Sequence, residues 1–296
     1  MASKLVLALL SLAAAGAALP LEPRASITAL STSQISAFKP YTHYASTAYC
    51  TPASTLAWSC GANCKANPGF VPVASGGDGT SVQFWYVGFD PSLKTVVVAH
   101  QGTDPSSFTA DLTDADIPRK NLDSSLFPGI SSSVEAHSGF ANEQAKTAKQ
   151  VLSAVQSALS AHKATSVTLV GHSLGAALSL IDSVYLPLHL PSGTTFKTVL
   201  YGLPRVGNQA FADYVDAHLH VTHISNKKDI VPIVPGRFLG FHHPAGEVHI
   251  TESNVWESCP GQDNTSSLCT VGDVPNVFDG NTSDHSGPYD GITMGC

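Results

Sequence analysis

The segment Gly171-His-Ser-Leu-Gly175 holds a serine between two glycines, a spacing that suits a reactive hydroxyl. The β-branched residues 166–170 before it are typical of a strand, and the Ala- and Leu-rich residues 174–180 after it are typical of a helix. A strand, a sharp turn with Ser and then a helix make up a nucleophile elbow. Side chains at the two glycine positions would collide with the neighbouring strand and helix. Ser173 is therefore the candidate nucleophile.

A serine hydroxyl needs a base to remove its proton and an acid to hold that base in the right tautomer. After an elbow, the acid and then the base follow in the chain, each on a loop behind a strand. Asp229 comes directly after the predicted strand 220–225 and is the candidate acid. Asp213 and Asp216 lie within a predicted helix and are expected to be surface charges.

The candidate bases are the histidines that follow Asp229, namely His242, His243, His249 and His285. His242 and His243 precede a proline in a loop, and His249 fits a strand better. His285 lies in the turn-forming segment 281–287, which could reach over the sheet. We take His285 as the leading base, while a purely structural role is open for each histidine.

The elements that must position these residues alternate along the chain. Strands are expected at 81–88, 95–100, 166–170, 195–201, 220–225 and 247–251, and helices at 27–48 with a break at Pro40, 138–162, 174–180 and 208–218. Residues 51–70 and 259–296 are expected to be loops. Alternating strands and helices with short links predict an α/β fold, with a central, mostly parallel sheet flanked by helices.

The N-terminus predicts export. Lys4 is followed by an apolar run that ends in small residues, so residues 1–18 are expected to be a cleaved signal peptide. This run is shorter than the ~20 residues that span a bilayer, and no later stretch is long enough either. Residues 19–26 would be a short propeptide with processing at Arg24, which leaves 27–296 as one domain.

The six cysteines of an exported chain are expected to form disulfides. Fifteen connectivities are possible; short separations favour Cys60–Cys64 and Cys259–Cys269, which leaves Cys50–Cys296. The spacing of Cys60 and Cys64 also suits metal ligands, but no second pair of ligands lies nearby. No metal site is therefore expected. Asn264 and Asn281 begin glycosylation sequons.

Composition limits the partners. Of the 296 residues, only 12% are charged, the formal net charge is −7, and no basic cluster is present. We therefore expect neither nucleic acid nor an anionic membrane surface as a partner, and no cofactor motif is found. We expect a monomer.

Six motifs in order resemble the secreted fungal class 3 lipases, a family that includes feruloyl esterases: Val97-Val-Ala-His-Gln-Gly-Thr103, Ala136-His-Ser-Gly-Phe140, Gly171-His-Ser-Leu-Gly175, Tyr201-Gly-Leu-Pro-Arg-Val-Gly207, Asn226-Lys-Lys-Asp-Ile-Val-Pro232 and Phe241-His-His-Pro244. The resemblance implies an α/β-hydrolase fold with Ser173 as nucleophile, Asp229 as acid and His285 as base. It also implies an oxyanion hole from the N–H groups of Thr103 and Leu174, and the cysteine pairing given above. Gln101 stands where the family usually has Arg, so the local support of the hole must differ.

In lipases of this family the segment after Thr103 forms a lid. Here Phe108 and Leu112 are its only large apolar residues, and it also carries three aspartates. Two such side chains contribute about 2 kcal/mol each on burial. We therefore expect weak interfacial activation and activity on soluble esters as well as lipids.

The function expected from the sequence is a secreted carboxylic ester hydrolase that acts on acylglycerols through an acyl-enzyme, without a cofactor. Two alternatives are open: a feruloyl-type esterase for aromatic acid esters, and a catalytically inactive hydrolase-fold module used for binding.

Overall fold

The computed structural model describes residues 26–103 and 118–296. Within these residues, nine strands form one mixed sheet in the order β1-β11-β10-β9-β8-β7-β4-β3-β2. The strands are β1 (Thr28–Ala29), β2 (Val71–Gly76), β3 (Trp85–Asp90), β4 (Thr95–His100), β7 (Ser166–His172), β8 (Thr195–Tyr201), β9 (Val221–Asn226), β10 (Glu247–Ile250) and β11 (Trp256–Cys259). The five neighbours from β4 to β10 run parallel, and the sheet edges are antiparallel. A small second sheet pairs β5 (Arg119–Asn121) with β6 (Glu135–His137).

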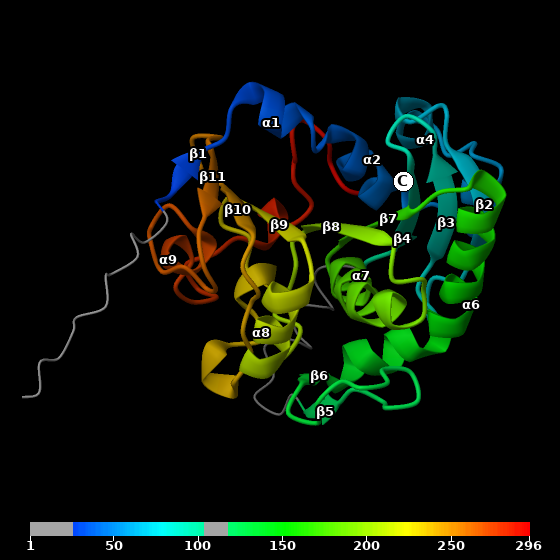
Figure 1. Cartoon of the computed structure of the whole chain (residues 1–296). Helices are drawn as coiled ribbons and strands as arrows, with labels where there is room; N and C mark the ends of the chain where they lie inside the picture. Colours follow the sequence, from blue (N-terminus) through cyan, green and yellow to red (C-terminus); the bar gives the residue numbers. More distant parts are fainter. Residues whose placement is uncertain (1–25, 104–117) are drawn as a thin grey trace, which may run out of the picture.

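Helices cover both faces of the main sheet (Figure 1). The long helices are α2 (Lys39–Thr47), α6 (Ser138–His162), α7 (Leu174–Tyr185) and α8 (Gln209–His218); α1 (Thr32–Ser36), α3 (Pro52–Leu56), α4 (Ala62–Ala66) and α9 (Thr270–Asp273) are short. Single 3-10 turns form η1 (Leu186–Leu188), η2 (Val231–Ile233), η3 (Arg237–Leu239) and η4 (Thr282–Asp284).

The alternation of side chains along β4 divides the core in two. Val96 and Val98 pack with residues of α6, α7 and α8 on one face. Val97 and Ala99 pack with residues of α2 on the other face. Because both faces are covered, all six residues of β4 are buried, which explains its nearly continuous apolar sequence.

The predicted central strands and the helix 138–162 are confirmed, but the N-terminal third differs from the prediction. Residues 51–70 contain the helices α3 and α4 instead of a loop. Pro40 does not break a helix; it lies in the first turn of α2, where the missing N–H removes no hydrogen bond. Strands β2 and β11 were not predicted, because neither has a regular alternation of apolar residues.

The strand expected at 81–88 begins only at Trp85. Asp78 is the reason, because its Oδ1 accepts hydrogen bonds from the main-chain N–H groups of Thr80, Ser81 and Val82. These bonds hold residues 78–82 in a turn, so their N–H groups are not available for pairing with a strand.

Three disulfides join Cys50 to Cys296, Cys60 to Cys64 and Cys259 to Cys269. The first connects residues 246 positions apart and ties the end of α2 to the C-terminus. In the described parts of the chain, no helix combines the length and apolar character that crossing a bilayer requires.

Removal of the Cys50–Cys296 bond by a double substitution to Ser should lower the free energy of unfolding by up to about 5 kcal/mol, because it closes a very long loop in the unfolded chain. The same change at Cys60 and Cys64 should cost about 2 kcal/mol by the same relation. Urea unfolding of both variants measures the difference. A larger loss from the short loop would contradict the loop-closure explanation.

Candidate active site

Ser173 lies at the junction of β7 and α7 with φ 60° and ψ −130°, a conformation that a non-glycine residue adopts only under strain. Its surroundings leave no room for side chains at the flanking glycines. A Cβ on Gly171 would lie 2.2 Å from the main-chain oxygen of Gly175, and one on Gly175 would lie 2.1 Å from that of His100. The two glycines thus let α7 pack directly on β7 and β4, with Ser173 at the apex of the turn.

Asp229 and His285 form a hydrogen-bonded pair. His285 Nδ1 lies 2.8 Å from Asp229 Oδ2, and both side chains are fully buried. The other Asp229 oxygen accepts a hydrogen bond of 2.9 Å from the N–H of Val231. This arrangement assigns the proton to Nδ1 of His285 and leaves the lone pair of Nε2 free.

Two reactive atoms lack partners. Among the described residues, neither Ser173 Oγ nor His285 Nε2 has a hydrogen-bond partner, although both atoms are buried. Buried polar atoms are normally paired, so two free ones in one site indicate groups kept available for a substrate. Hydrogen bonds between catalytic groups often form only once a substrate is bound.

His172 supports the loop of His285. Its Nε2 donates to the main-chain oxygen of His285 at 2.8 Å, so its Nδ1 is the acceptor for the Tyr49 hydroxyl at 2.6 Å. Burial, together with the nearby His285, lowers the pKa of His172 well below its usual range and keeps the ring neutral. Burial likewise raises the pKa of the Tyr49 phenol, which stays a donor.

The expected oxyanion donors belong to two different elements. Leu174 is the first residue of α7, so its N–H is one of the unpaired groups at a helix start. Thr103 follows β4, and its Oγ1 is buried without a partner in the described part of the chain. Gly102 lets the segment before Thr103 lie close to Ser173, since a Cβ on Gly102 would lie 2.9 Å from the Cβ of Ser173.

Gln101 supports this segment in place of an arginine. Its side-chain oxygen accepts a hydrogen bond of 2.9 Å from the N–H of Phe84, and its own N–H donates to the Phe84 oxygen at 2.8 Å. Preceding it, His100 contacts the buried Asp182 at 2.7 Å, and Gln144 donates to the other Asp182 oxygen. The segment before Thr103 is therefore fixed by neutral amide contacts and one buried pair.

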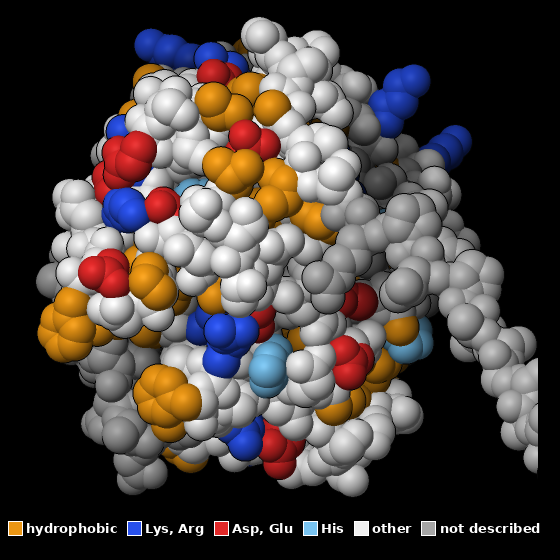
Figure 2. All heavy atoms as spheres, turned by 90° about the vertical axis from the view of Figure 1, so that its left-hand side faces the viewer, with side chains coloured by type: hydrophobic (Ala, Val, Ile, Leu, Met, Phe, Trp, Pro, Cys, Tyr) orange, Lys and Arg blue, Asp and Glu red, His pale blue; other side chains and the backbone are white. Residues whose placement is uncertain are grey.

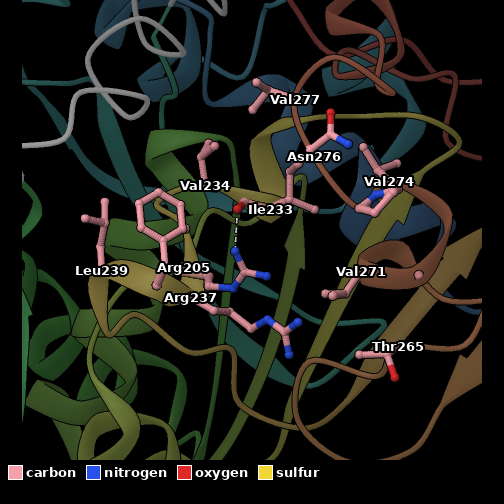
Figure 3. Close-up of a pocket in the computed structure, with 14 residues that line it drawn as sticks. Arg205, Ile233, Val234, Arg237, Leu239, Thr265, Val271, Val274, Asn276 and Val277 are labelled. Atoms are coloured by element: carbon pink, nitrogen blue, oxygen red, sulfur yellow. Dashed lines mark hydrogen bonds between the residues drawn. The ribbon is translucent and has the colours of Figure 1, made fainter.

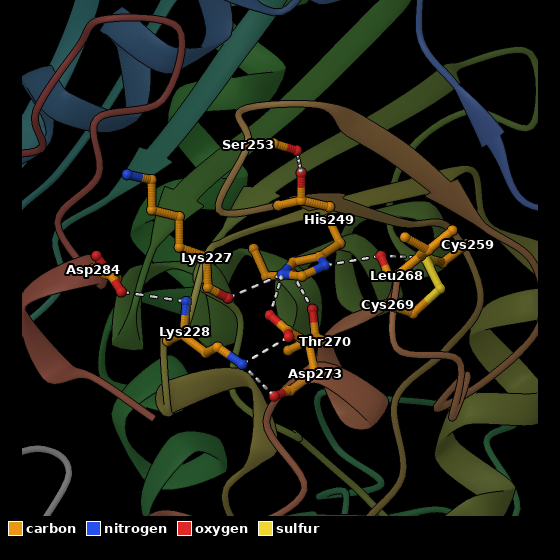
Figure 4. Close-up of polar contacts among 12 residues, drawn as sticks. Lys227, Lys228, His249, Ser253, Cys259, Leu268, Cys269, Thr270, Asp273 and Asp284 are labelled. Atoms are coloured by element: carbon orange, nitrogen blue, oxygen red, sulfur yellow. Dashed lines mark hydrogen bonds and ion pairs between the residues drawn. A yellow bond between two sulfur atoms is a disulfide. The ribbon is translucent and has the colours of Figure 1, made fainter. Parts of the chain in front are cut away.

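A polar cluster joins the loops that carry Asp229 and His285 (Figure 4). The N–H of Lys228 donates to Asp284 Oδ2 at 3.3 Å, and Lys228 Nζ lies 2.7 Å from Asp273 Oδ1. Asn226 donates to the main-chain oxygen of Asp284 at 2.9 Å. Hydrogen bonds and an ion pair thus connect the residues that adjoin Asp229 with those that adjoin His285.

His249 lies behind this cluster and is not available as a base. Its ring nitrogens lie 2.9 Å from the main-chain oxygens of Leu268 and Lys227, and 3.8 Å separates it from an Asp273 oxygen. Both ring nitrogens are therefore engaged by main-chain oxygens. His249 therefore supports the loops from β10.

The remaining candidates also lie away from Ser173. His243 contacts the main-chain oxygen of Pro232 at 2.7 Å, and burial lowers its pKa to about 3. His242 lies 3.5 Å from Asp263. Asp213 and Asp216 accept hydrogen bonds from Gln262 near the surface. The prediction missed Tyr49, His172 and the His100–Asp182 pair. His172 and His100 each lie inside a motif quoted above, whereas Tyr49 and Asp182 carried no sequence signal.

A mainly apolar cavity of about 660 Å³ lies next to η2, the 3-10 turn that follows Asp229 in the sequence (Figure 3). Its wall includes Ile233, Val234, Val271, Val274 and Val277. Arg205, also in the wall, is buried and bound to Asp263 at 2.8 Å. The cavity suits an extended apolar group.

Two phenylalanines near this cavity face solvent. Phe238 lines the cavity and is 88% exposed, and Phe278, next to the lining residue Val277, is 94% exposed. Figure 2 shows apolar side chains in separate groups on the face of the molecule that carries β1, β11 and α9. Phe108 and Leu112 of the expected lid lie outside the described residues. Of the sequon residues, Asn281 is exposed and Asn264 is half-buried.

Comparison with known proteins places this site in a family. The model of the family described as "Lipase (class 3)" matches residues 97–239 of this chain. Two secreted mono- and diacylglycerol lipases of Malassezia globosa are 35% identical: MDL2 over 66% of this chain and 63% of its own length, and MDL3 over 72% and 69%. The match therefore spans somewhat less than two thirds of MDL2.

Solved structures agree. Lipase II from Rhizopus niveus superposes with a TM-score of 0.78 and 28% identity over 91% of this chain and 98% of its own. A lipase from Rhizopus microsporus var. chinensis superposes with a TM-score of 0.77 and 27% identity over 93% of each chain. The predicted α/β-hydrolase fold is confirmed. The chain belongs to the class 3 lipase family.

Proposed function

We propose that the protein is a secreted carboxylic ester hydrolase that cleaves acylglycerols. Ser173 is the nucleophile, His285 the general base and Asp229 the acid that orients it, and the N–H groups of Thr103 and Leu174 bind the oxyanion. The observation that carries the proposal is the Asp229–His285 pair of 2.8 Å beside an elbow serine, with Ser173 Oγ and His285 Nε2 both free to react.

The chemistry follows from these atoms. His285 Nε2 takes the Ser173 proton as Oγ attacks the ester carbonyl, and the charge on the carbonyl oxygen develops against two N–H donors. Asp229 stabilises the resulting imidazolium. The ring then gives its proton to the leaving alcohol, and an acyl-serine remains. Water, deprotonated by His285, releases the acid and restores the serine.

The substrate class follows from the apolar cavity and the relatives. The cavity near Val234 offers about 660 Å³ for an acyl chain, and the named relatives act on mono- and diacylglycerols and are secreted. Three disulfides fit export, because such bonds persist in oxidising compartments.

Ser173→Ala should reduce kcat for tributyrin on the order of 10⁶-fold, because no other nucleophile is in place. Acid release is titrated from below to above the solubility limit of tributyrin, with Ser179→Ala as a control for a buried serine of α7. If Ser173→Ala keeps its activity, the proposal is wrong. The same titration tests the expected weak interfacial activation, which a sharp rise in rate at the solubility limit would contradict.

Asp229→Asn should lower kcat by roughly 10⁴-fold with KM little changed, because an amide can leave His285 in the wrong tautomer. Steady-state kinetics on dissolved p-nitrophenyl butyrate, with Asp213→Asn as the matched surface control, measures this. Equal activity of both variants would remove Asp229 from the triad.

Phe238→Ser together with Phe278→Ser should weaken adsorption to triacylglycerol droplets. Each exposed ring contributes about 2 kcal/mol when it leaves water. Depletion of protein from the aqueous phase by a tributyrin emulsion is measured, with the exposed pair Leu56→Ser and Val71→Ser as control. Equal depletion of both variants would show that the two rings do not bind the lipid surface.

A further inference from the structure

A second cavity, of about 490 Å³, is lined by residues that adjoin Ser173 and His285 in the chain. Its wall contains Thr103, the proposed oxyanion donor, Ser286, which follows His285, and His172, which precedes Ser173. In ester cleavage the departing alcohol oxygen receives its proton from His285 Nε2, so the alcohol must lie beside His285. The cavity is therefore in the right position for the alcohol portion of an ester.

The wall of this cavity is polar and uncharged. Its polar side chains are Tyr49, Thr80, Gln83, Gln101, Thr103 and Ser286, and no Lys, Arg, Asp or Glu is among the described residues that line it. His172 is kept neutral by burial, which lowers its pKa. Such a wall suits a neutral group with hydroxyls, because a buried charge would have no counter-charge. It differs in this respect from the apolar cavity beside Val234.

Gln83 supplies the specific feature. Its side chain is only 6% exposed, and its Oε1 is buried without a hydrogen-bond partner in residues 26–103 and 118–296. The main chain there is fixed, since the N–H of Gln83 donates to Glu143 Oε1 at 3.1 Å and the next N–H donates to Gln101. A buried amide oxygen without a donor, on a fixed main chain, is a ready acceptor for a ligand hydroxyl.

Thr103 adds a second unpaired group to the same wall. Its Oγ1 is also buried without a partner in the described chain, whereas the hydroxyls of Tyr49 and Thr80 are engaged by His172 and Asp78. The unpaired side-chain oxygens among these lining residues thus belong to Gln83 and Thr103. A polyol with neighbouring hydroxyls could meet both atoms, but a simple alkanol could not.

Building on the proposed ester hydrolysis, we propose that this polar cavity binds the glycerol portion of the substrate, with Gln83 Oε1 accepting a hydrogen bond from a free hydroxyl. In the cleavage step the bond between the acyl carbon and the glycerol oxygen breaks. Its electron pair goes to that oxygen, and the proton from His285 completes the hydroxyl. The site therefore selects esters whose alcohol carries unacylated hydroxyls, and Gln83 is a specificity-determining residue.

The test compares three butyrate esters on the unaltered chain: monobutyrin, its acetonide, in which the two free hydroxyls are masked, and methyl butyrate. All three are used below their solubility limits. We expect kcat/KM for monobutyrin to exceed that for the acetonide by about fivefold or more, the value of one neutral hydrogen bond. This comparison does not depend on the folding of any variant.

Gln83→Met removes the amide and keeps most of the volume. It should lower kcat/KM for monobutyrin about fivefold more than for methyl butyrate, and it should abolish the preference for monobutyrin over the acetonide. Gln156→Met, an exposed glutamine of α6, is the matched control and should keep the parent's preference.

The outcomes separate the two proposals. A parent that cleaves none of the esters contradicts the proposed function. A parent that cleaves all of them without preferring monobutyrin to the acetonide overturns only the assignment of the cavity. If Gln83→Met lowers all three rates equally, or keeps the preference, Gln83 is a structural residue and the inference is also wrong.

Discussion

Main-chain packing around Ser173 is the constraint on which the site depends. The turn exists because α7 packs on β7 and β4 with no side chain between them at Gly171 and Gly175. A methyl group at either position would separate the helix from the strands and displace the turn that carries Ser173 and the N–H of Leu174. The strain of the serine at φ 60° is held by this packing. The proposed oxyanion donor and the proposed nucleophile are therefore fixed by the same contact.

Buried hydrogen-bonded groups fix the loops of Asp229 and His285 relative to Ser173. Tyr49, His172 and the main-chain oxygen of His285 form one chain of hydrogen bonds. Lys228 and its partners join the Asp229 and His285 loops from the other side. Each group in these chains is paired, whereas the atoms that would meet a substrate are not. Among the other supporting residues, Asn226 Oδ1, His100 Nδ1 and Gln144 Oε1 also lack partners in the described part of the chain.

The two cavities differ in character, and the ester of the proposed reaction has two corresponding parts. The cavity beside Val234 is mainly apolar, and the one beside Gln83 is polar and uncharged. Gln101 contributes to the second, because an amide at this position supports the segment before Thr103 without placing a cation in the wall. The position that departs from the family pattern thus also sets the electrostatics of the cavity.

The sequence by itself determined the local features. The β-branched run, the glycine spacing and the order of serine, aspartate and histidine predict the elbow, the central strands and the candidate residues, because steric limits and side-chain periodicity act between near neighbours. The turn at residues 78–82 escaped this reasoning, since one Asp78 side chain outweighs the strand preference of the residues that follow.

Only the tertiary structure decided which histidine meets Asp229. All four candidates follow Asp229, but His249 and His243 are bound by main-chain oxygens, and His285 comes back to Asp229 across 56 residues. The contact of Tyr49 with His172, 123 residues apart, and the unpaired Gln83 oxygen are equally invisible in the sequence. Their reason is physical: hydrogen bonds and cavities form between surfaces that the folded sheet brings together, and no local pattern encodes that meeting.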